Sequence, residues 1–141
     1  MTRYLDGWML PALDEANREF FTSGKIVVRE CRGCQTIQHP PEDLCYRCGG
    51  YEFGGREVAG TGTIYSHTVI RHPVHPKLSE RLPYTVVLVS LDELPDVRIT
   101  GNLLEAAPED VRVGLAVRAV WEEIPDPETG DVLRLPQWVP A

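Results

Sequence analysis

Four cysteines arranged as two pairs place the strongest constraint on how this 141-residue chain folds. The pairs read CRGC at residues 31–34 and CYRC at residues 45–48, and ten residues separate them. Each C-x-x-C turn aims two thiolates at one point, and two such turns together surround that point with a tetrahedron of sulfurs, which suits zinc. The sequence therefore predicts one structural zinc ion with four protein ligands: Cys31, Cys34, Cys45 and Cys48.

Residues around the cysteines favour this metal site. Gly33 and Gly49 lie where such knuckles need backbone freedom. Four thiolates around a divalent ion leave a net charge of about minus two. Nearby arginines are expected to offset that charge: Arg29, Arg32 and Arg47.

Other uses of four cysteines remain open. Two disulfides require an oxidising compartment, an iron site takes the same four ligands, and a redox pair needs a C-x-x-C that opens a helix after a strand. The N-terminus lacks the apolar core of a signal peptide, and no run of about 18 apolar residues appears, so we expect a cytoplasmic protein without a membrane span. Because a closed four-thiolate site leaves no position for substrate, we assign it no catalysis.

The rest of the chain predicts a mainly β fold. Residues 10–24 have the apolar spacing of a helix, with Pro11 near the start and Gly24 as a stop signal. Short β-forming runs cover residues 58–70, 84–91, 97–104, 115–124 and 132–139. A bent first strand containing glycine favours a five-stranded antiparallel OB-fold barrel, with an SH3-like barrel as the main rival. We expect an N-terminal helical segment over 1–24, a rubredoxin-like zinc ribbon over 25–57, and the barrel with a C-terminal extension over 58–141.

Charge and strand pattern argue against two common functions. OB-folds and zinc ribbons often bind single-stranded nucleic acid, but the net charge of −7 and the few cations on the strands disfavour it. Tyr65 and Tyr84 are the aromatic candidates if that alternative holds. Ser66 and His67 are adjacent on a strand and point to opposite faces, so they do not form a nucleophile and base. We nominate no catalytic residue.

The order of motifs resembles one known family. After the two C-x-x-C pairs come GTGTIYSHT at residues 60–68, PYTVVLVSLDE from Pro83, ITGNLL, and VGLAVRAVWEE. This order resembles the acyl-CoA-associated zinc-ribbon and OB-fold family once catalogued as domain of unknown function thirty-five. The resemblance covers residues 10–124. The chain departs from it at Tyr46, where many members have proline.

The resemblance implies an accessory role in acyl-CoA chemistry. Similar chains accompany thiolase-superfamily enzymes, among them lipid-transfer-protein-like aldolases that cleave the side chain of steroid β-hydroxyacyl-CoA thioesters. Others hold a thiolase beside a hydroxymethylglutaryl-CoA synthase, which is the alternative reading. We therefore expect a subunit that is not catalytic alone, that forms a heterotetramer with a thiolase-like dimer, and that has acyl-CoA near the interface.

Candidate contacts with such a partner fall in two groups. A basic loop at 71–81 joins two predicted strands and is expected to be exposed, where it could meet CoA phosphates or a partner; its candidates are Arg71, His72, His75, Lys77 and Arg81. Aromatic and apolar residues near the termini often anchor partners, although they equally often cover their own fold; these are Tyr4, Trp8, Met9, Phe20, Phe21 and Trp138.

Overall fold

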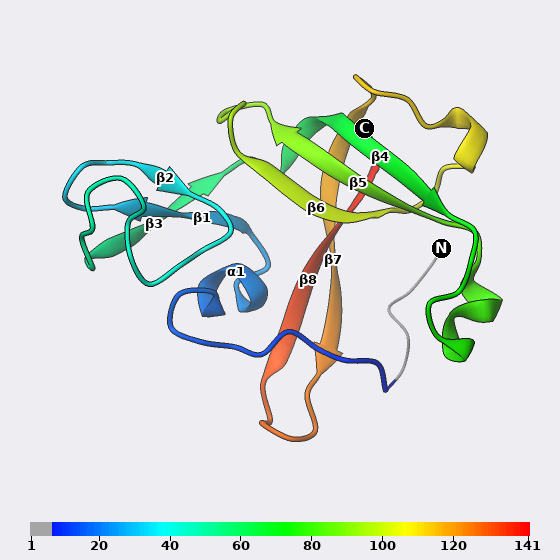
Figure 1. The fold of residues 1–141 in the computed structure, drawn as a ribbon, viewed down its shortest axis with the longest axis horizontal. Helices are drawn as coiled ribbons and strands as arrows, with labels where there is room; N and C mark the ends of the chain where they lie inside the picture. Colours follow the sequence, from blue (N-terminus) through cyan, green and yellow to red (C-terminus); the bar gives the residue numbers. More distant parts are fainter. Residues whose placement is uncertain (1–6) are drawn as a thin grey trace.

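The computed structural model describes residues 7–141 as a three-stranded sheet beside a closed five-stranded barrel (Figure 1). The sheet lies at one end of the long axis of the molecule and the barrel at the other. The elements are α1 (Arg18–Thr22), β1 (Ile26–Cys31), β2 (Ile37–Gln38), β3 (Phe53–Val58), β4 (Thr61–Ile70), η1 (Pro76–Arg81), β5 (Tyr84–Leu91), β6 (Arg98–Leu103), η2 (Pro108–Asp110), β7 (Ala116–Pro125) and β8 (Val132–Pro140).

The three-stranded sheet carries the cysteine pairs. Strand β1 is central and pairs antiparallel with β2 and β3, in a register that sets Ile26 opposite Val58 and Cys31 opposite Phe53. The apolar start of β1 is buried, whereas its C-terminal end leads into the first knuckle. This sheet is the zinc ribbon that the cysteine spacing predicts.

The barrel has the strand order β4-β5-β6-β8-β7, which is the order of an OB-fold. Its neighbours run antiparallel except β6 and β8, which meet in parallel at Leu103 and Trp138. Strand β4 bends at a bulge between Ile64 and Ser66, as expected for a long strand that two sides of a barrel share. The predicted mainly β fold with a zinc ribbon and an OB barrel is confirmed.

One hydrophobic cluster joins the two units. Ile26, Val28 and Val58 of the ribbon belong to the same buried cluster as Ile64 and Val89 of the barrel. Only Ala59 and Gly60 connect β3 to β4. Gly60 passes so close to β7 that a Cβ atom there would lie 2.9 Å from the Cβ of Ala119.

The helix is shorter than the sequence predicts. We expected helix over residues 10–24, but α1 covers only Arg18–Thr22. Asp14 and Asn17 each accept a hydrogen bond from the other's backbone N–H through a side-chain oxygen, both at 2.8 Å. Such side-chain bonds compete with helical ones and hold a turn in place of the first helical turns.

Two further expectations need correction. The predicted strand over 58–70 is interrupted at Ala59 and Gly60, so that Val58 ends β3 in the ribbon and β4 begins the barrel. Trp138 is fully buried in β8, so it cannot anchor a partner. Its position near the end of the chain suggested exposure, but β8 pairs with β7 at nine positions and closes the barrel.

Candidate metal centre and its surroundings

The four predicted cysteines meet at one point at the tip of the ribbon. All four sulfurs lie within 4.8 Å of one another. Cys31 and Cys48 sulfurs are 3.6 Å apart, as are those of Cys34 and Cys45. Zinc–sulfur bonds of about 2.3 Å in a tetrahedron put sulfurs about 3.8 Å apart, so the residues present fit a zinc ion. The cofactor is structural zinc, held by all four thiolates.

Two equivalent knuckles present the cysteines. In the first, Cys31 N–H donates to Thr36 O and Gln35 N–H donates to Cys31 O. In the second, Cys45 N–H donates to Gly50 O and Gly49 N–H donates to Cys45 O. Each of these four bonds is 2.9 Å long. The two cysteine turns therefore have the same pattern of backbone hydrogen bonds.

Each knuckle contains one residue in the left-handed backbone conformation, and in the first knuckle this residue is not the one that we expected. Gly49 has φ of 75°, as predicted, but in the first knuckle the left-handed residue is Gln35 with φ of 62°, not Gly33. Gly33 instead lies against the sulfurs, where a Cβ would be 3.7 Å from the Cys31 sulfur. Its role is close packing around the metal rather than backbone freedom.

Gln38 connects the knuckles and was not anticipated from the sequence. Its buried side chain donates from Nε2 to Leu44 O and accepts at Oε1 from Tyr46 N–H, both at 2.9 Å. These bonds tie β2 to the second cysteine turn. Nothing in the sequence distinguishes Gln38 from the other polar residues of the spacer, among them Gln35 and Thr36.

The pKa values of the cysteine thiols favour the binding of a cation among them. The pKa of Cys34 is lowered to about 6, mainly by a hydrogen bond from the Thr36 side chain and next by one from the Thr36 backbone. The Gly50 N–H lowers the pKa of Cys48, but the thiols of Cys31, Cys34 and Cys45 outweigh it and raise that pKa to about 12. Neighbouring thiolates repel one another, and a positive ion between them favours the loss of the remaining protons.

The arginines that we expected beside the metal bind backbone carbonyls. Arg29 Nε donates to Glu42 O at 3.0 Å, and its guanidinium lies 4.1 Å from the centre of the Phe53 ring. Arg32 Nε donates to Phe53 O at 3.1 Å. Arg47 is exposed. Arg29 and Arg32 thus stabilise the backbone of the ribbon around the metal site.

A half-buried histidine lies between the ribbon and α1. The His39 ring is 4.9 Å from the Phe20 ring, which in turn makes an edge contact of 5.1 Å with Phe21. Burial lowers the pKa of His39 to about 4, so the ring is neutral near pH 7. Phe20 is 7% exposed and belongs to the core, which leaves little of it for a partner to touch.

The basic loop lies at the opposite end of the molecule from the metal site (Figure 1). Residues 71–77 are all exposed. His75 Nδ1 accepts from Lys77 N–H at 3.1 Å and caps η1, and the Trp8 ring meets the His75 ring edge-on at 5.2 Å. The structure thus brings Trp8 to the loop, while Phe20 and Phe21 lie elsewhere. Met9 is 74% exposed, and Tyr4 lies outside the described residues.

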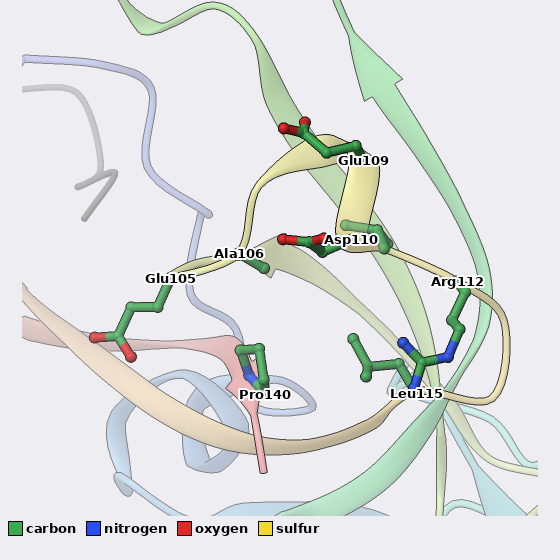
Figure 2. A pocket seen from close by; sticks show the side chains of 8 residues that line it. Glu105, Ala106, Glu109, Asp110, Arg112, Leu115 and Pro140 are labelled. Atoms are coloured by element: carbon green, nitrogen blue, oxygen red, sulfur yellow. The ribbon is translucent and has the colours of Figure 1, made fainter.

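A shallow hollow of about 480 Å³ adjoins η2 (Figure 2). Figure 2 shows carboxylates around it with one arginine on the far side. Its lining is Glu105, Ala106, Glu109, Asp110, Val111, Arg112, Leu115 and Pro140. The hollow contains none of the sequence-predicted site residues. No helix in residues 7–141 has the length and apolar character needed to cross a bilayer.

Comparison with known proteins gives two family matches. Residues 18–53 match the rubredoxin-like zinc ribbon domain of ChsH2, and residues 55–122 match the C-terminal OB-fold domain of ChsH2. The chain is also similar to a chain of the Ltp2-ChsH2(DUF35) aldolase structure, with 36% identity and a TM-score of 0.75 over 93% of this chain and 98% of that one.

Two curated relatives are much longer than the part of them that this chain matches. It is 38% identical to a probable enoyl-CoA hydratase alpha subunit of Thermomonospora curvata, covering 93% of this chain and 39% of the relative. It is 31% identical to the 3-oxo-4,17-pregnadiene-20-carboxyl-CoA hydratase alpha subunit of Mycobacterium tuberculosis, covering 64% of this chain and 28% of the relative.

The third relative is of similar size. The chain is 32% identical to a DUF35 domain-containing scaffold protein of Methanocaldococcus jannaschii, covering 72% of this chain and 69% of the relative. The shared features are the paired cysteine knuckles followed by a barrel. With its zinc ribbon joined directly to an OB-fold, this chain belongs to the DUF35 family of ChsH2-type proteins.

Proposed function

We propose that this chain is a non-catalytic accessory subunit that binds and activates a thiolase-superfamily enzyme acting on acyl-CoA. The observation that carries this proposal is its similarity, at 36% identity over nearly its full length, to a chain of the Ltp2-ChsH2(DUF35) aldolase. By that likeness, the reaction is the retro-aldol cleavage of a β-hydroxyacyl-CoA that forms the side chain of a steroid. The name of the M. tuberculosis relative, which refers to a pregnadiene-carboxyl-CoA, supports the same substrate class.

The chemistry of the chain supports an accessory role. The four thiolates fill the coordination sphere of a tetrahedral zinc ion, so the metal offers no position to a substrate. Retro-aldol cleavage needs a base that removes the hydroxyl proton and an acid that protonates the α-carbon after the carbon–carbon bond breaks. We place both groups on the partner enzyme.

This chain then contributes by positioning parts of the partner enzyme and the substrate, not by chemistry of its own. By binding at the mouth of the acyl-CoA tunnel it orders loops of the partner and completes the pocket for a bulky acyl group. The exposed loop with Arg71, His72 and Lys77 is the candidate contact with the partner enzyme or with CoA phosphates. Two copies per enzyme dimer, a heterotetramer, is the simplest symmetric assembly.

A second candidate is a scaffold that joins a thiolase to a hydroxymethylglutaryl-CoA synthase. The 32% identity to an archaeal DUF35 scaffold protein favours it. The two candidates differ in the number of enzymes bound: an aldolase subunit binds one enzyme, whereas a scaffold binds two at once.

The test is co-expression of this chain with the thiolase-like protein encoded beside it. We expect co-elution on gel filtration at the mass of a heterotetramer, and faster cleavage of a β-hydroxyacyl-CoA than either protein gives alone. Separate elution together with equal activity in the presence and absence of this chain would contradict the proposal. Recovery of two different enzymes in one complex would select the scaffold.

A further inference from the structure

One edge of the barrel lacks a neighbouring strand. β4 pairs with β5 from Gly62 to Ile70, but its pairing with β7 ends at Thr63. Ile64 makes the last contacts on that side, donating to Leu115 O and accepting from Gly114 N–H. From residue 65 to residue 70, no strand within the described part of the chain pairs with this side of β4.

The ladder fixes which backbone groups face outward. Asp92 N–H donates to Thr61 O, so even-numbered positions of β5 turn their backbone groups toward β4. Ser66 and Thr68 stand opposite Leu88 and Val86, and their backbone groups therefore point to β5. By alternation, the N–H and C=O of His67 and Val69 point away from the barrel, ready to pair with another strand.

The side chains leave this edge open. Four consecutive residues, Tyr65 to Thr68, are exposed. Past the bulge, the inward and outward alternation of β4 gives way to exposure on both faces. Tyr65, 46% exposed, lies under Arg98, whose guanidinium is 3.9 Å from the ring centre. An edge of this kind is a docking site for an extended segment.

Cations gather at both ends of the edge. Arg98 lies at its start, and the exposed Arg71 and Lys77 follow its end. Residues 65–81 contain a single acid, Glu80, although the whole chain has 21 acidic residues against 14 basic ones. This segment of an acidic protein therefore carries a local excess of positive charge beside the unpaired strand, three basic residues against one acid, which favours an acidic partner segment.

We propose that the β4 edge, residues 65–70 with Arg98, Arg71 and Lys77, binds an acidic extended segment of the enzyme partner as an added strand. This deepens the proposed function and rests on it. A second copy of this chain is a poorer occupant. Antiparallel pairing of two such edges about Thr68 would place Arg71 of one copy beside Tyr65 and Arg98 of the other, where like charges repel.

The first experiment removes one outward N–H. In His67→Pro the edge loses a donor while the ladder to β5 keeps all its bonds, because proline is tolerated where the N–H faces solvent. His67→Ala is the matched control, since it removes the side chain and keeps the N–H. Binding of each full-length variant to the thiolase-like enzyme is measured by biolayer interferometry. We expect His67→Pro to bind about tenfold or more weakly and His67→Ala to bind nearly as wild type.

The second experiment reverses charge. Arg71→Glu combined with Lys77→Glu is expected to slow association about tenfold at low salt and to flatten its salt dependence. Arg118→Glu is the control, because this exposed residue stands opposite Thr61, at the other end of β4. Circular dichroism and zinc content confirm that each variant is folded.

The outcomes separate the two proposals. If wild type does not bind the enzyme, the proposed function fails and this inference with it. If wild type binds and His67→Pro, Arg71→Glu and Lys77→Glu leave the affinity unchanged, the docking edge is wrong while the proposed function stands. A homodimer of this chain that His67→Pro abolishes would overturn the choice of occupant.

Discussion

At the scale of single residues, His39 links stability to pH. Its folded pKa of about 4 lies below the ordinary 6.5 because burial penalises the charged ring. Between these values the unfolded chain binds more protons than the folded one, so stability is complete above about pH 6.5 and falls as the pH drops toward 4. The shift corresponds to at most about 3 kcal/mol.

We therefore predict that His39→Phe, which keeps a ring beside Phe20, loses this part of the pH dependence. Thermal unfolding from pH 7 to pH 4 measures it. Because thiolate protonation affects both proteins equally, the difference between their melting temperatures isolates His39. Parallel curves for variant and wild type would show that His39 does not carry the effect.

Gly101 is a second residue with a clear steric role. A Cβ atom there would lie 2.8 Å from Cδ1 and 3.0 Å from Nε1 of the buried Trp138 ring. We predict that Gly101→Ala destabilises the fold by about 1–3 kcal/mol, because the added methyl group would overlap a ring that is fully buried in the core. Urea unfolding measures the change, with Thr100→Ala, an exposed position on the same strand, as the control expected to change little.

At the scale of elements, Arg134 of the barrel forms a hydrogen bond to the short helix α1. From β8 it donates through Nη1 to Thr22 O at 2.9 Å and pairs through Nε with Glu123 at 3.1 Å. The Thr22 carbonyl is at the end of α1, where helical partners run out. We predict that Arg134→Met costs about 1 kcal/mol of unfolding free energy.

Glu123→Gln separates the two contacts of Arg134. It removes only the exposed ion pair, so a loss below about 0.5 kcal/mol is expected. Chemical denaturation of both variants gives the comparison. Equal losses would mean that the ion pair, and not the bond to the helix, carries the stability.

The barrel strands were largely predictable and the ribbon strands were not. The run at 84–91 matches β5 because a dense run of β-branched residues has few alternatives. The run at 132–139 matches β8 within a residue because the turn-rich segment before it marks where the strand begins. The break at Gly60 was missed since it depends on the close approach to Ala119, a long-range contact. The helix was overestimated because apolar spacing does not report the Asp14–Asn17 turn.

The metal site followed from spacing alone, but its support did not. Four cysteines in two C-x-x-C pairs define the ligands before any fold is known. Gln38, in contrast, bonds to Leu44 and Tyr46 only after the hairpin has closed. The unpaired edge of β4 is likewise a property of the assembled barrel, because it depends on where β7 leaves.

At the scale of the whole molecule, zinc stabilises more than the ribbon tip. Ile26, Val28 and Val58 share one buried cluster with the barrel, so loosening the ribbon exposes part of the barrel core. We predict that removing zinc with a chelator lowers the melting temperature of the whole chain in a single transition. Calorimetry is the measurement, and re-addition of zinc is the control. Two separate transitions, with the barrel unchanged, would contradict this coupling.

The two-residue connection between β3 and β4 has a thermodynamic consequence for association. Because only Ala59 and Gly60 connect the ribbon to the barrel, and both units share one buried cluster, we expect the two units to keep the same relative position in the free chain. Binding to the partner then requires little further ordering of this chain. We therefore expect the heat-capacity change of binding, measured by titration calorimetry at several temperatures, to match the apolar area buried at the interface, without the excess that accompanies coupled folding.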